Sequence, residues 1–205
     1  MEQDALFSLE PERPAEGPVV VDETFATAAR TWLDETSWVD HVPGWLTGDR
    51  VLMAELQERD TWVQRRRWMY TREVVEPRLT AEHPVLAEVP FPVVRHLGAV
   101  LSRRYDRPYA RLWINWYRDH DDSTGWHADK PAARASEAVV PVLSLGATRR
   151  FRVRPAAGGP ATTYVVQGGD LVVMGGRCQR DFVHDVPKER TPTGARLSLN
   201  FSVAP

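Results

Sequence analysis

Short apolar segments separated by Gly, Pro and Asp residues dominate the second half of the chain. These segments are rich in Val, Thr, Tyr and Phe, and no helical pattern intervenes between them, which is typical of the strands of a β-sandwich or jelly roll. The pattern predicts strands over residues 111–117, 139–145, 151–154, 162–166, 170–174 and 196–203.

The first half of the chain has a helical periodicity instead. Apolar residues recur three and four positions apart over residues 22–38, 49–58 and 93–101, which predicts a helix in each segment. Residues 1–21 are acidic and contain three prolines, which predicts a mobile or loosely docked arm.

The expected domain organisation follows from this change of pattern. We interpret residues 1–21 as an acidic, Pro-containing arm, residues 22–108 as a helical N-terminal part and residues 109–205 as a jelly-roll core. No flexible linker separates the last two segments, so we expect them to pack as one compact unit. The predicted fold class is therefore mainly β with N-terminal helices.

The composition of this chain of 205 residues restricts its chemistry and its location. A single cysteine, Cys178, excludes an intramolecular disulfide and a cysteine-based zinc site. No apolar run approaches the roughly 18 residues of a membrane helix, and the acidic N-terminus lacks the pattern of a signal peptide. We therefore expect a cytoplasmic protein with no membrane partner.

Charge is unevenly distributed along the chain. Residues 1–60 carry 4 basic and 14 acidic residues, whereas residues 61–118 carry 11 basic and 5 acidic residues. A basic segment within an acidic chain is compatible with a face that binds a polyanion such as nucleic acid. The alternative is a set of solvated arginines on ordinary surface elements.

Two of the six histidines, His120 and His127, begin an H-x-D triplet. His120 lies in a segment of turn composition, whereas His127 begins a new segment beside the predicted sheet. Residues two apart in a strand point to the same face, so His127 and Asp129 could bind one metal ion. With His184 as a third ligand they would form the facial triad of non-haem Fe(II) oxygenases. The alternative is that each histidine is a surface or hydrogen-bonded residue.

The last predicted strand has a polar face that includes an arginine. The polar residues that alternate with its apolar positions are Arg196, Ser198, Asn200 and Ser202. Arginine can hold a carboxylate through two parallel hydrogen bonds, so this face would suit a dicarboxylate, although a solvated edge strand has the same pattern. Asn115 and Tyr117 share a face of the first core strand, where they can satisfy structural hydrogen bonds or line a co-substrate pocket.

Five sequence motifs occur together in the order found in one enzyme family. They are INWY (114–117), GWHAD (125–129), GDLVVMGG (169–176), FVHDVP (182–187) and RLSLNF (196–201). Over roughly residues 60–203, the chain resembles the AlkB-type dioxygenases, which demethylate nucleic acids. The resemblance implies a double-stranded β-helix, which is a jelly roll with the metal between its sheets, and an N-terminal nucleotide-recognition lid.

The resemblance also implies roles for individual residues. The implied Fe(II) ligands are His127, Asp129 and His184. Arg196 would pair with the distal carboxylate of 2-oxoglutarate, and Asn115 and Tyr117 would hydrogen-bond the same co-substrate.

The lid implied by the resemblance is the basic, aromatic stretch from Arg65 to Arg72. Its base-stacking residue would be Tyr70, with Met69 and Trp68 as neighbours. Phosphate contacts would come from at least one of Arg65, Arg66 and Arg67. The alternatives are that the aromatic residues belong to the N-terminal core and that the arginines form a solvated face.

One position departs from the family pattern in a way that affects co-substrate binding. The family usually carries a second arginine at the place of Ser202, where it would meet the carboxylate of 2-oxoglutarate that chelates iron. A serine cannot neutralise this charge. The metal itself, or a nearby arginine such as Arg190, would then have to neutralise the charge of this carboxylate.

The main functional hypothesis is an Fe(II)- and 2-oxoglutarate-dependent dioxygenase that uses O2 to demethylate N-alkylated bases in DNA or RNA. Its products would be formaldehyde, succinate and CO2, its partner alkylated nucleic acid, and its expected state a monomer. One alternative is a hydroxylase of a protein or small molecule, since the jelly roll hosts many such reactions. Another is a nucleic-acid-binding module whose iron site is degenerate.

Overall fold

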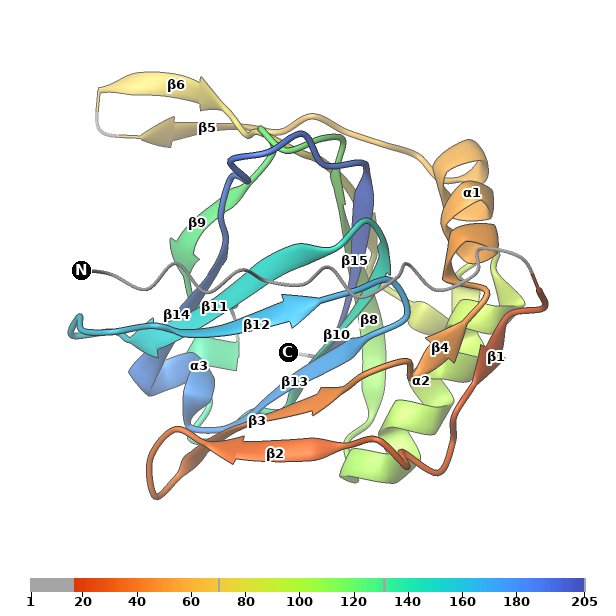
Figure 1. The fold of residues 1–205 in the computed structure, drawn as a ribbon, viewed down its shortest axis with the longest axis horizontal. Helices are drawn as coiled ribbons and strands as arrows, with labels where there is room; N and C mark the ends of the chain where they lie inside the picture. Colours follow the sequence, from red (N-terminus) through yellow and green to blue (C-terminus); the bar gives the residue numbers. More distant parts are fainter. Residues whose placement is uncertain (1–16, 70, 131, 205) are drawn as a thin grey trace.

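The computed structural model describes residues 17–69, 71–130 and 132–204, without the side chains of residues 67, 69 and 72. Two antiparallel sheets form the core of the molecule (Figure 1). The major sheet has the order β2 (Ala29–Trp32), β3 (Ser37–Val42), β13 (Leu171–Gly176), β10 (Val140–Gly146), β15 (Arg196–Val203), β8 (Tyr109–Tyr117) and β7 (Leu79–His83). The minor sheet has the order β12 (Thr162–Val166), β11 (Arg149–Pro155), β14 (Phe182–Val186) and β9 (Thr124–His127).

This arrangement confirms the predicted fold class, a mainly β jelly roll with helices from the N-terminal half. All six predicted strands are present. Within residues 109–205, two further strands were not predicted, β9 and β14, and the second of them contains His184. Two short sheets complete the described part of the chain: β1 (Val20–Val21) with β4 (Leu46–Thr47), and β5 (Arg66–Met69) with β6 (Arg72–Val75).

Apolar side chains on the central strands are buried on both faces of the major sheet. In β13, Leu171 and Val173 pack into the cluster beneath the helices, whereas Val172 and Met174 pack into the cluster with residues of the minor sheet. Strand residues alternate between faces, so a continuous apolar run is what a strand between two packed layers requires. The candidate site lies on the second of these faces.

Two of the three helices expected in the N-terminal half are confirmed, and in both the apolar spacing is accompanied by residues that favour a helix start. Helix α1 (Asp49–Arg59) follows Gly48, whose φ of 68° is a left-handed conformation that glycine adopts readily. Helix α2 (Pro92–Tyr105) has Pro92 in its first turn, where the missing N–H costs nothing. Short 3₁₀ turns η1 (Leu86–Glu88) and η2 (Ala132–Arg134) and the single-turn helix α3 (Cys178–Asp181) connect other elements.

The helix expected over residues 22–38 is wrong. The carboxylate of Asp22 accepts hydrogen bonds from the backbone N–H groups of Thr24 and Ala26, and Phe25 has a φ of 55°, so the chain turns instead of winding. Asp34 then caps a tight turn by accepting the N–H of Ser37 at 2.7 Å. The segment forms the hairpin β2–β3 at the edge of the major sheet.

The N-terminal half is thus built into the sheet. Strands β2, β3 and β7 belong to residues 22–108 and pair with one another or with core strands β13 and β8. Most of the expected arm, residues 1–16, lies outside the described residues. Its last two residues form β1. No helix in the described part of the chain is long and apolar enough to cross a membrane.

Candidate metal and co-substrate site

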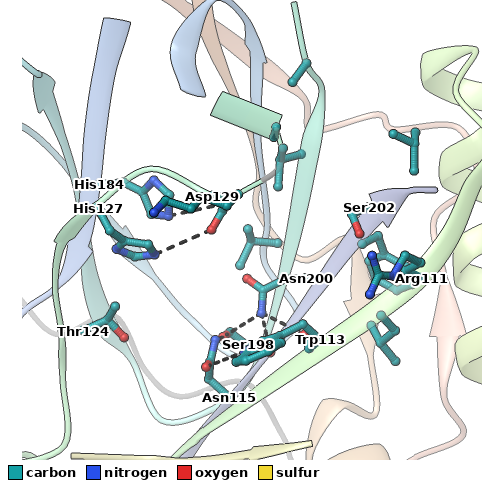
Figure 2. Close-up of a pocket in the computed structure, with 18 of the residues that line it drawn as sticks. Arg111, Trp113, Asn115, Thr124, His127, Asp129, His184, Ser198, Asn200 and Ser202 are labelled. Carbon is teal, nitrogen blue, oxygen red and sulfur yellow. Dashed lines mark hydrogen bonds and ion pairs between the residues drawn. The ribbon is translucent and has the colours of Figure 1, made fainter. Parts of the chain in front are cut away.

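Adjacent strands of the minor sheet bring two histidines together. His127 ends β9 and His184 is the middle residue of β14, and the two are direct partners in antiparallel pairing, with ring centroids 4.2 Å apart. Asp129 follows β9 and faces both rings (Figure 2). Its Oδ1 lies 3.6 Å from His127 Nε2 and its Oδ2 lies 3.7 Å from His184 Nε2. The structure therefore brings together the three side chains predicted to share a metal ion.

The donor atoms of this cluster suit a divalent transition metal. One ligand atom from each residue lies within 4.8 Å of the other two. His127 Nδ1–H donates to the carbonyl oxygen of Gly125 at 2.8 Å, which fixes the tautomer and leaves Nε2 facing Asp129. Two imidazoles and one carboxylate are the facial ligand set of Fe(II) oxygenases, and they leave other coordination positions open.

Burial and mutual attraction set the protonation states in this cluster. Burial lowers the pKa of His184 to about 4, so this imidazole is neutral near pH 7. Burial alone would also lower the pKa of His127, but its hydrogen bond with Asp129 raises it above the usual value. Burial would raise the pKa of Asp129, yet the charges of His184 and His127 and the hydrogen bonds outweigh it and the pKa is lowered. An ionised carboxylate and a neutral imidazole are the forms that bind metals.

A buried glutamine that the sequence analysis missed holds Asp129 in place. Gln179, in α3, accepts the Asp129 N–H at 2.8 Å and donates Nε2–H to Asp129 Oδ2 at 3.2 Å. Both contacts orient the carboxylate toward the histidines. The sequence carries no distinctive signal for this role, because Gln179 is 50 residues from its partner and lies in a polar stretch between two motifs.

A cavity of about 550 Å³ joins this cluster to the polar face of β15. Strand β15 lies between β10 and β8, so its polar face is not a solvated edge. Four directly opposed pairs of β15 and β8 residues line the cavity: Arg196–Tyr117, Ser198–Asn115, Asn200–Trp113 and Ser202–Arg111. We call these eight residues the cross-strand ladder; several of them are labelled in Figure 2.

Arg196 lies at one end of the ladder with unused hydrogen-bonding capacity. It is 1% exposed and donates one hydrogen bond, from Nη2 to Ser144 Oγ at 2.7 Å. Its Nε and Nη1 have no hydrogen-bond partner among the described residues. Burial lowers its pKa to about 10, which still leaves it cationic at neutral pH. A buried guanidinium with unpaired donors costs free energy unless an anion satisfies it, and a carboxylate matches its geometry.

Asn115 and Tyr117 line the same cavity, where each already has a partner. Asn115 Oδ1 accepts hydrogen bonds from Arg78 Nε at 2.9 Å and from Trp113 Nε1 at 2.8 Å. The hydroxyl of Tyr117 is 2.8 Å from Thr124 Oγ1. Arg78 and Trp113 are cavity residues that the sequence analysis missed, since only the strand register shows that they reach Asn115.

Strands β5 and β6, in the expected lid segment, form a two-stranded hairpin that extends away from the body of the molecule (Figure 1). Arg65 forms an ion pair with Glu82 and lies over the Trp113 ring at 4.3 Å, so its charge is already partly used. Arg66 is exposed and pairs with Glu73 at 3.3 Å. Trp68 is 75% exposed, which contradicts a place for it in the core. Tyr70 and the side chains of Arg67 and Met69 lie outside the described residues.

Two further expectations concern residues around the site. Ser202 lines the cavity at the end of the ladder opposite Arg196. Arg190 is exposed and does not line the cavity, so its place gives no support to the idea that it compensates for Ser202. The second H-x-D histidine, His120, lies with Asp119 and Asp121 in a surface turn, as its composition predicts.

Comparisons with known proteins agree with this geometry. Residues 23–201 match the 2OG-Fe(II) oxygenase superfamily. The mouse (Mus musculus) alpha-ketoglutarate-dependent dioxygenase alkB homolog 3 is 32% identical over 176 residues, which cover 73% of this chain and 59% of the mouse protein. The DNA oxidative demethylase ALKBH2 of Arabidopsis thaliana is 27% identical over 135 residues, which cover 54% of this chain and 43% of that protein. The chain thus spans less than two thirds of the length of these relatives.

Solved structures support the fold alone, because their sequence identities are low. The structure of OsALKBH1 has a TM-score of 0.56 at 15% identity and covers 85% of this chain and 100% of that chain. A prolyl hydroxylase from Trichoplax adhaerens, in complex with a hypoxia inducible factor peptide, has a TM-score of 0.58 at 10% identity, covering 80% and 82%. These two likenesses therefore show the fold and do not identify a substrate.

Proposed function

Because the chain belongs to the 2OG-Fe(II) oxygenase superfamily, whose members use Fe(II), 2-oxoglutarate and O2, we propose that it oxidatively demethylates N-alkylated bases in DNA or RNA. The observation that carries the proposal is the position of the His–Asp–His cluster and the unsatisfied Arg196 on the wall of one cavity. A cavity with metal ligands and an unpaired buried cation fits a dicarboxylate that chelates a metal.

In this proposal the cluster of His127, Asp129 and His184 holds Fe(II), with Gln179 fixing the carboxylate. Bound there, Fe(II) supplies the oxidising chemistry: 2-oxoglutarate and O2 yield succinate and CO2, and the N-methyl carbon is hydroxylated and lost as formaldehyde. The neutral imidazole of His184 needs no deprotonation before it binds the metal.

The co-substrate is held at the other end of its chain by Arg196. Its two unbonded nitrogens donate to the distal carboxylate, and the Tyr117 ring, 5.3 Å from the guanidinium carbon, packs against it. Burial excludes water from this contact and strengthens it. Asn115 and the hydroxyl of Tyr117 line the cavity and position the ligand, while Arg78 and Trp113 hold the Asn115 amide in one orientation.

The substrate class rests on the hairpin and on the named relatives. A methylated base must leave its stack to reach a metal inside a jelly roll, which costs a few kcal/mol and less for damaged bases. The hairpin β5–β6 presents the exposed Trp68 and the cation of Arg66 beyond the body of the molecule, a combination that suits stacking on bases and contact with phosphates. The relatives include a DNA oxidative demethylase. We assign Arg67, Met69 and Tyr70 to the same contact on sequence grounds.

The test measures formaldehyde and succinate from the purified protein with Fe(II), 2-oxoglutarate, ascorbate and air. Oligonucleotides that carry 1-methyladenine or 3-methylcytosine, single- and double-stranded, are compared with unmodified ones. We expect formaldehyde in step with succinate only with the methylated strands. Succinate without formaldehyde on any methylated strand would contradict the proposed substrate and leave a hydroxylase of a protein or small molecule.

The chain contains its own matched control for this assay. His127→Ala removes a proposed metal ligand, whereas His120→Ala removes the histidine of the other H-x-D triplet, which lies in a surface turn. We expect no product from the first variant and wild-type product from the second. Equal activity in both variants would exclude the proposed metal centre.

A further inference from the structure

The end of the cross-strand ladder opposite Arg196 carries a second arginine. Ser202 of β15 is directly paired with Arg111 of β8. Directly opposed residues of an antiparallel pair project from the same face of the sheet, so Arg111 points to the same side as Ser202. Both residues line the cavity, and Figure 2 shows them next to each other. The ladder therefore has a cation at each end, one on each strand.

Arg111 differs from the other arginines of the cavity wall in having no hydrogen-bond or ion-pair partner within the described part of the chain; Arg107 donates to the carbonyl oxygen of Asp106. Arg78 is bonded to Asn115 and to Glu76, and Arg196 to Ser144. The side chain of Arg111 is partly buried, and no hydrogen bond or ion pair joins it to any described residue. A half-buried guanidinium without a carboxylate gains most from an anion that enters the cavity.

We propose that Arg111 binds the carboxylate of 2-oxoglutarate nearest the metal and so supplies, from the neighbouring strand, the charge that Ser202 lacks. The inference rests on the proposed function, since it assumes that the co-substrate lies along the ladder with its distal carboxylate on Arg196. The metal-proximal carboxylate then faces the end of the ladder that holds Arg111. Arg111 can replace an arginine at position 202 because the register of β8 and β15 places Arg111 directly opposite Ser202.

The length of the ladder supports an arginine rather than a serine at this end. Strand residues rise about 3.4 Å each, so six positions separate the backbones of the end pairs by roughly 20 Å. A five-carbon dicarboxylate is shorter, and only long side chains that lean inward along their strands can contact both of its ends. Arginine has this reach and serine does not.

The test measures ligand binding rather than turnover. The protein is loaded with Mn(II), which does not support the oxidation, and is titrated with 2-oxoglutarate by calorimetry. We expect Arg111→Ala to weaken binding about tenfold, the loss of one charge-assisted contact. The matched control is Arg103→Ala, an exposed arginine of α2 that pairs with Glu23 and does not line the cavity. It should bind like wild type.

A second ligand distinguishes binding of the distal carboxylate from binding of the metal-proximal carboxylate. In 4-oxopentanoate a methyl group replaces the metal-proximal carboxylate of 2-oxoglutarate, and the distal carboxylate remains. We expect Arg111→Ala to bind it as wild type does and Arg196→Ala to lose it. A relocated charge, in the double variant Arg111→Ser with Ser202→Arg, should recover most of the affinity for 2-oxoglutarate.

The outcomes distinguish failure of this inference from failure of the proposed function. Wild-type affinity for 2-oxoglutarate in Arg111→Ala, with a loss in Arg196→Ala, would overturn the role of Arg111 alone. Wild-type affinity in both variants would overturn the proposed co-substrate site. Unchanged affinity for 2-oxoglutarate together with weaker binding of a methylated oligonucleotide in Arg111→Ala would assign Arg111 to a phosphate and also overturn the inference. Thermal unfolding of each variant shows that it is folded.

Discussion

Arg149 and Arg196 are equally buried and lie near the same aromatic ring, but they differ in how many hydrogen bonds their guanidinium groups make. Each is 1% exposed, and their guanidinium carbons lie 5.4 and 5.3 Å from the same Tyr117 ring. Arg149 donates to the carbonyl oxygens of Asp119, Asp122 and Pro187 at 2.7 to 2.9 Å. Arg196 donates one hydrogen bond and leaves two nitrogens without a partner in the described part of the chain.

The difference separates an arginine that serves the fold from one that is available to a ligand. Arg149 ties the turn between β8 and β9 to the segment after β14, and so holds in place the chain that leads to His127 and the chain that leaves His184. Buried polar groups are normally hydrogen-bonded, and one that is not calls for an explanation such as a ligand. Arg149 also has one nitrogen without a hydrogen bond, Nε, but Glu189 Oε1 lies 3.6 Å from it, whereas neither of the two unbonded nitrogens of Arg196 has a carboxylate partner among the described residues. Burial alone therefore does not identify a binding residue; unused donors without a carboxylate partner do.

The largest expected effect comes from removing Arg149. Arg149→Met should lower the free energy of unfolding by about 3–5 kcal/mol, because three backbone carbonyl groups lose a buried donor and Glu189 loses an ion-pair partner. Urea unfolding measures this loss. Arg150→Met, at the partly exposed neighbouring position that also pairs with Glu189, should cost less than about 1 kcal/mol. Equal losses in the two variants would show that the buried hydrogen bonds of Arg149 do not stabilise the fold.

Removing Arg196 should have a small effect on stability and a large effect on ligand binding. Arg196→Met should change the free energy of unfolding by no more than about 1 kcal/mol, since a buried and incompletely bonded charge is replaced by an apolar chain. Its affinity for 2-oxoglutarate should fall about 100-fold, or ~2.7 kcal/mol, with the loss of two charge-assisted hydrogen bonds. Urea unfolding measures the stability of this variant, and calorimetric titration of the same preparation measures its affinity for 2-oxoglutarate. A loss of stability as large as in Arg149→Met would break the comparison.

Gln179 should show an intermediate behaviour, because it is a buried residue whose contacts go to the site. Gln179→Leu removes both hydrogen bonds to Asp129 and should weaken metal binding about tenfold. Competition with a metal chelator measures the affinity. Gln167→Leu, in the turn before β13, serves as the control and should bind metal as wild type does. An unchanged metal affinity in Gln179→Leu would mean that Asp129 is oriented without it.

The smallest expected effect concerns pH and the metal-free protein. The pKa of His184 is lowered to about 4 from 6.5, so the unfolded chain takes up this proton first as the pH falls. The group therefore removes stability below about pH 6.5, by roughly 1 kcal/mol between pH 6.5 and 5.5. Wild type should lose that much more than His184→Gln over this interval in chelator-treated samples. If the free energies of unfolding of wild type and His184→Gln fell equally over this pH interval, His184 would not be buried in the neutral form.

The sequence analysis predicted the parts of the molecule in which local signals and tertiary packing agree. The six long strands, α1 and α2 belong to this class, since each has its periodicity and its turn or cap residues in the same short segment. The three clustered residues were predicted from motifs, and strand pairing explains their proximity: His127 and His184 are register partners.

The predictions that failed concern segments in which local signals conflict, or residues whose role depends on distant parts of the chain. Over residues 22–38 the helical spacing of apolar residues competes with Asp22 and Asp34, whose carboxylates bind backbone N–H groups and stabilise turns. The edge of the major sheet then provides partners for β3 that no local rule contains. Gln179 contacts a residue 50 positions away, and strand pairing places Arg111 opposite Ser202, so only the fold reveals these positions.

The position of β9 at the edge of the minor sheet links metal retention to local motion. This strand has one neighbour, β14, with an irregular register between His184 and Val186. Edge strands exchange their amide hydrogens through local opening more readily than central ones. An ion shared by His127, Asp129 and His184 would fasten that edge to the sheet, so amide protection along β9 should report metal occupancy before any catalytic assay does.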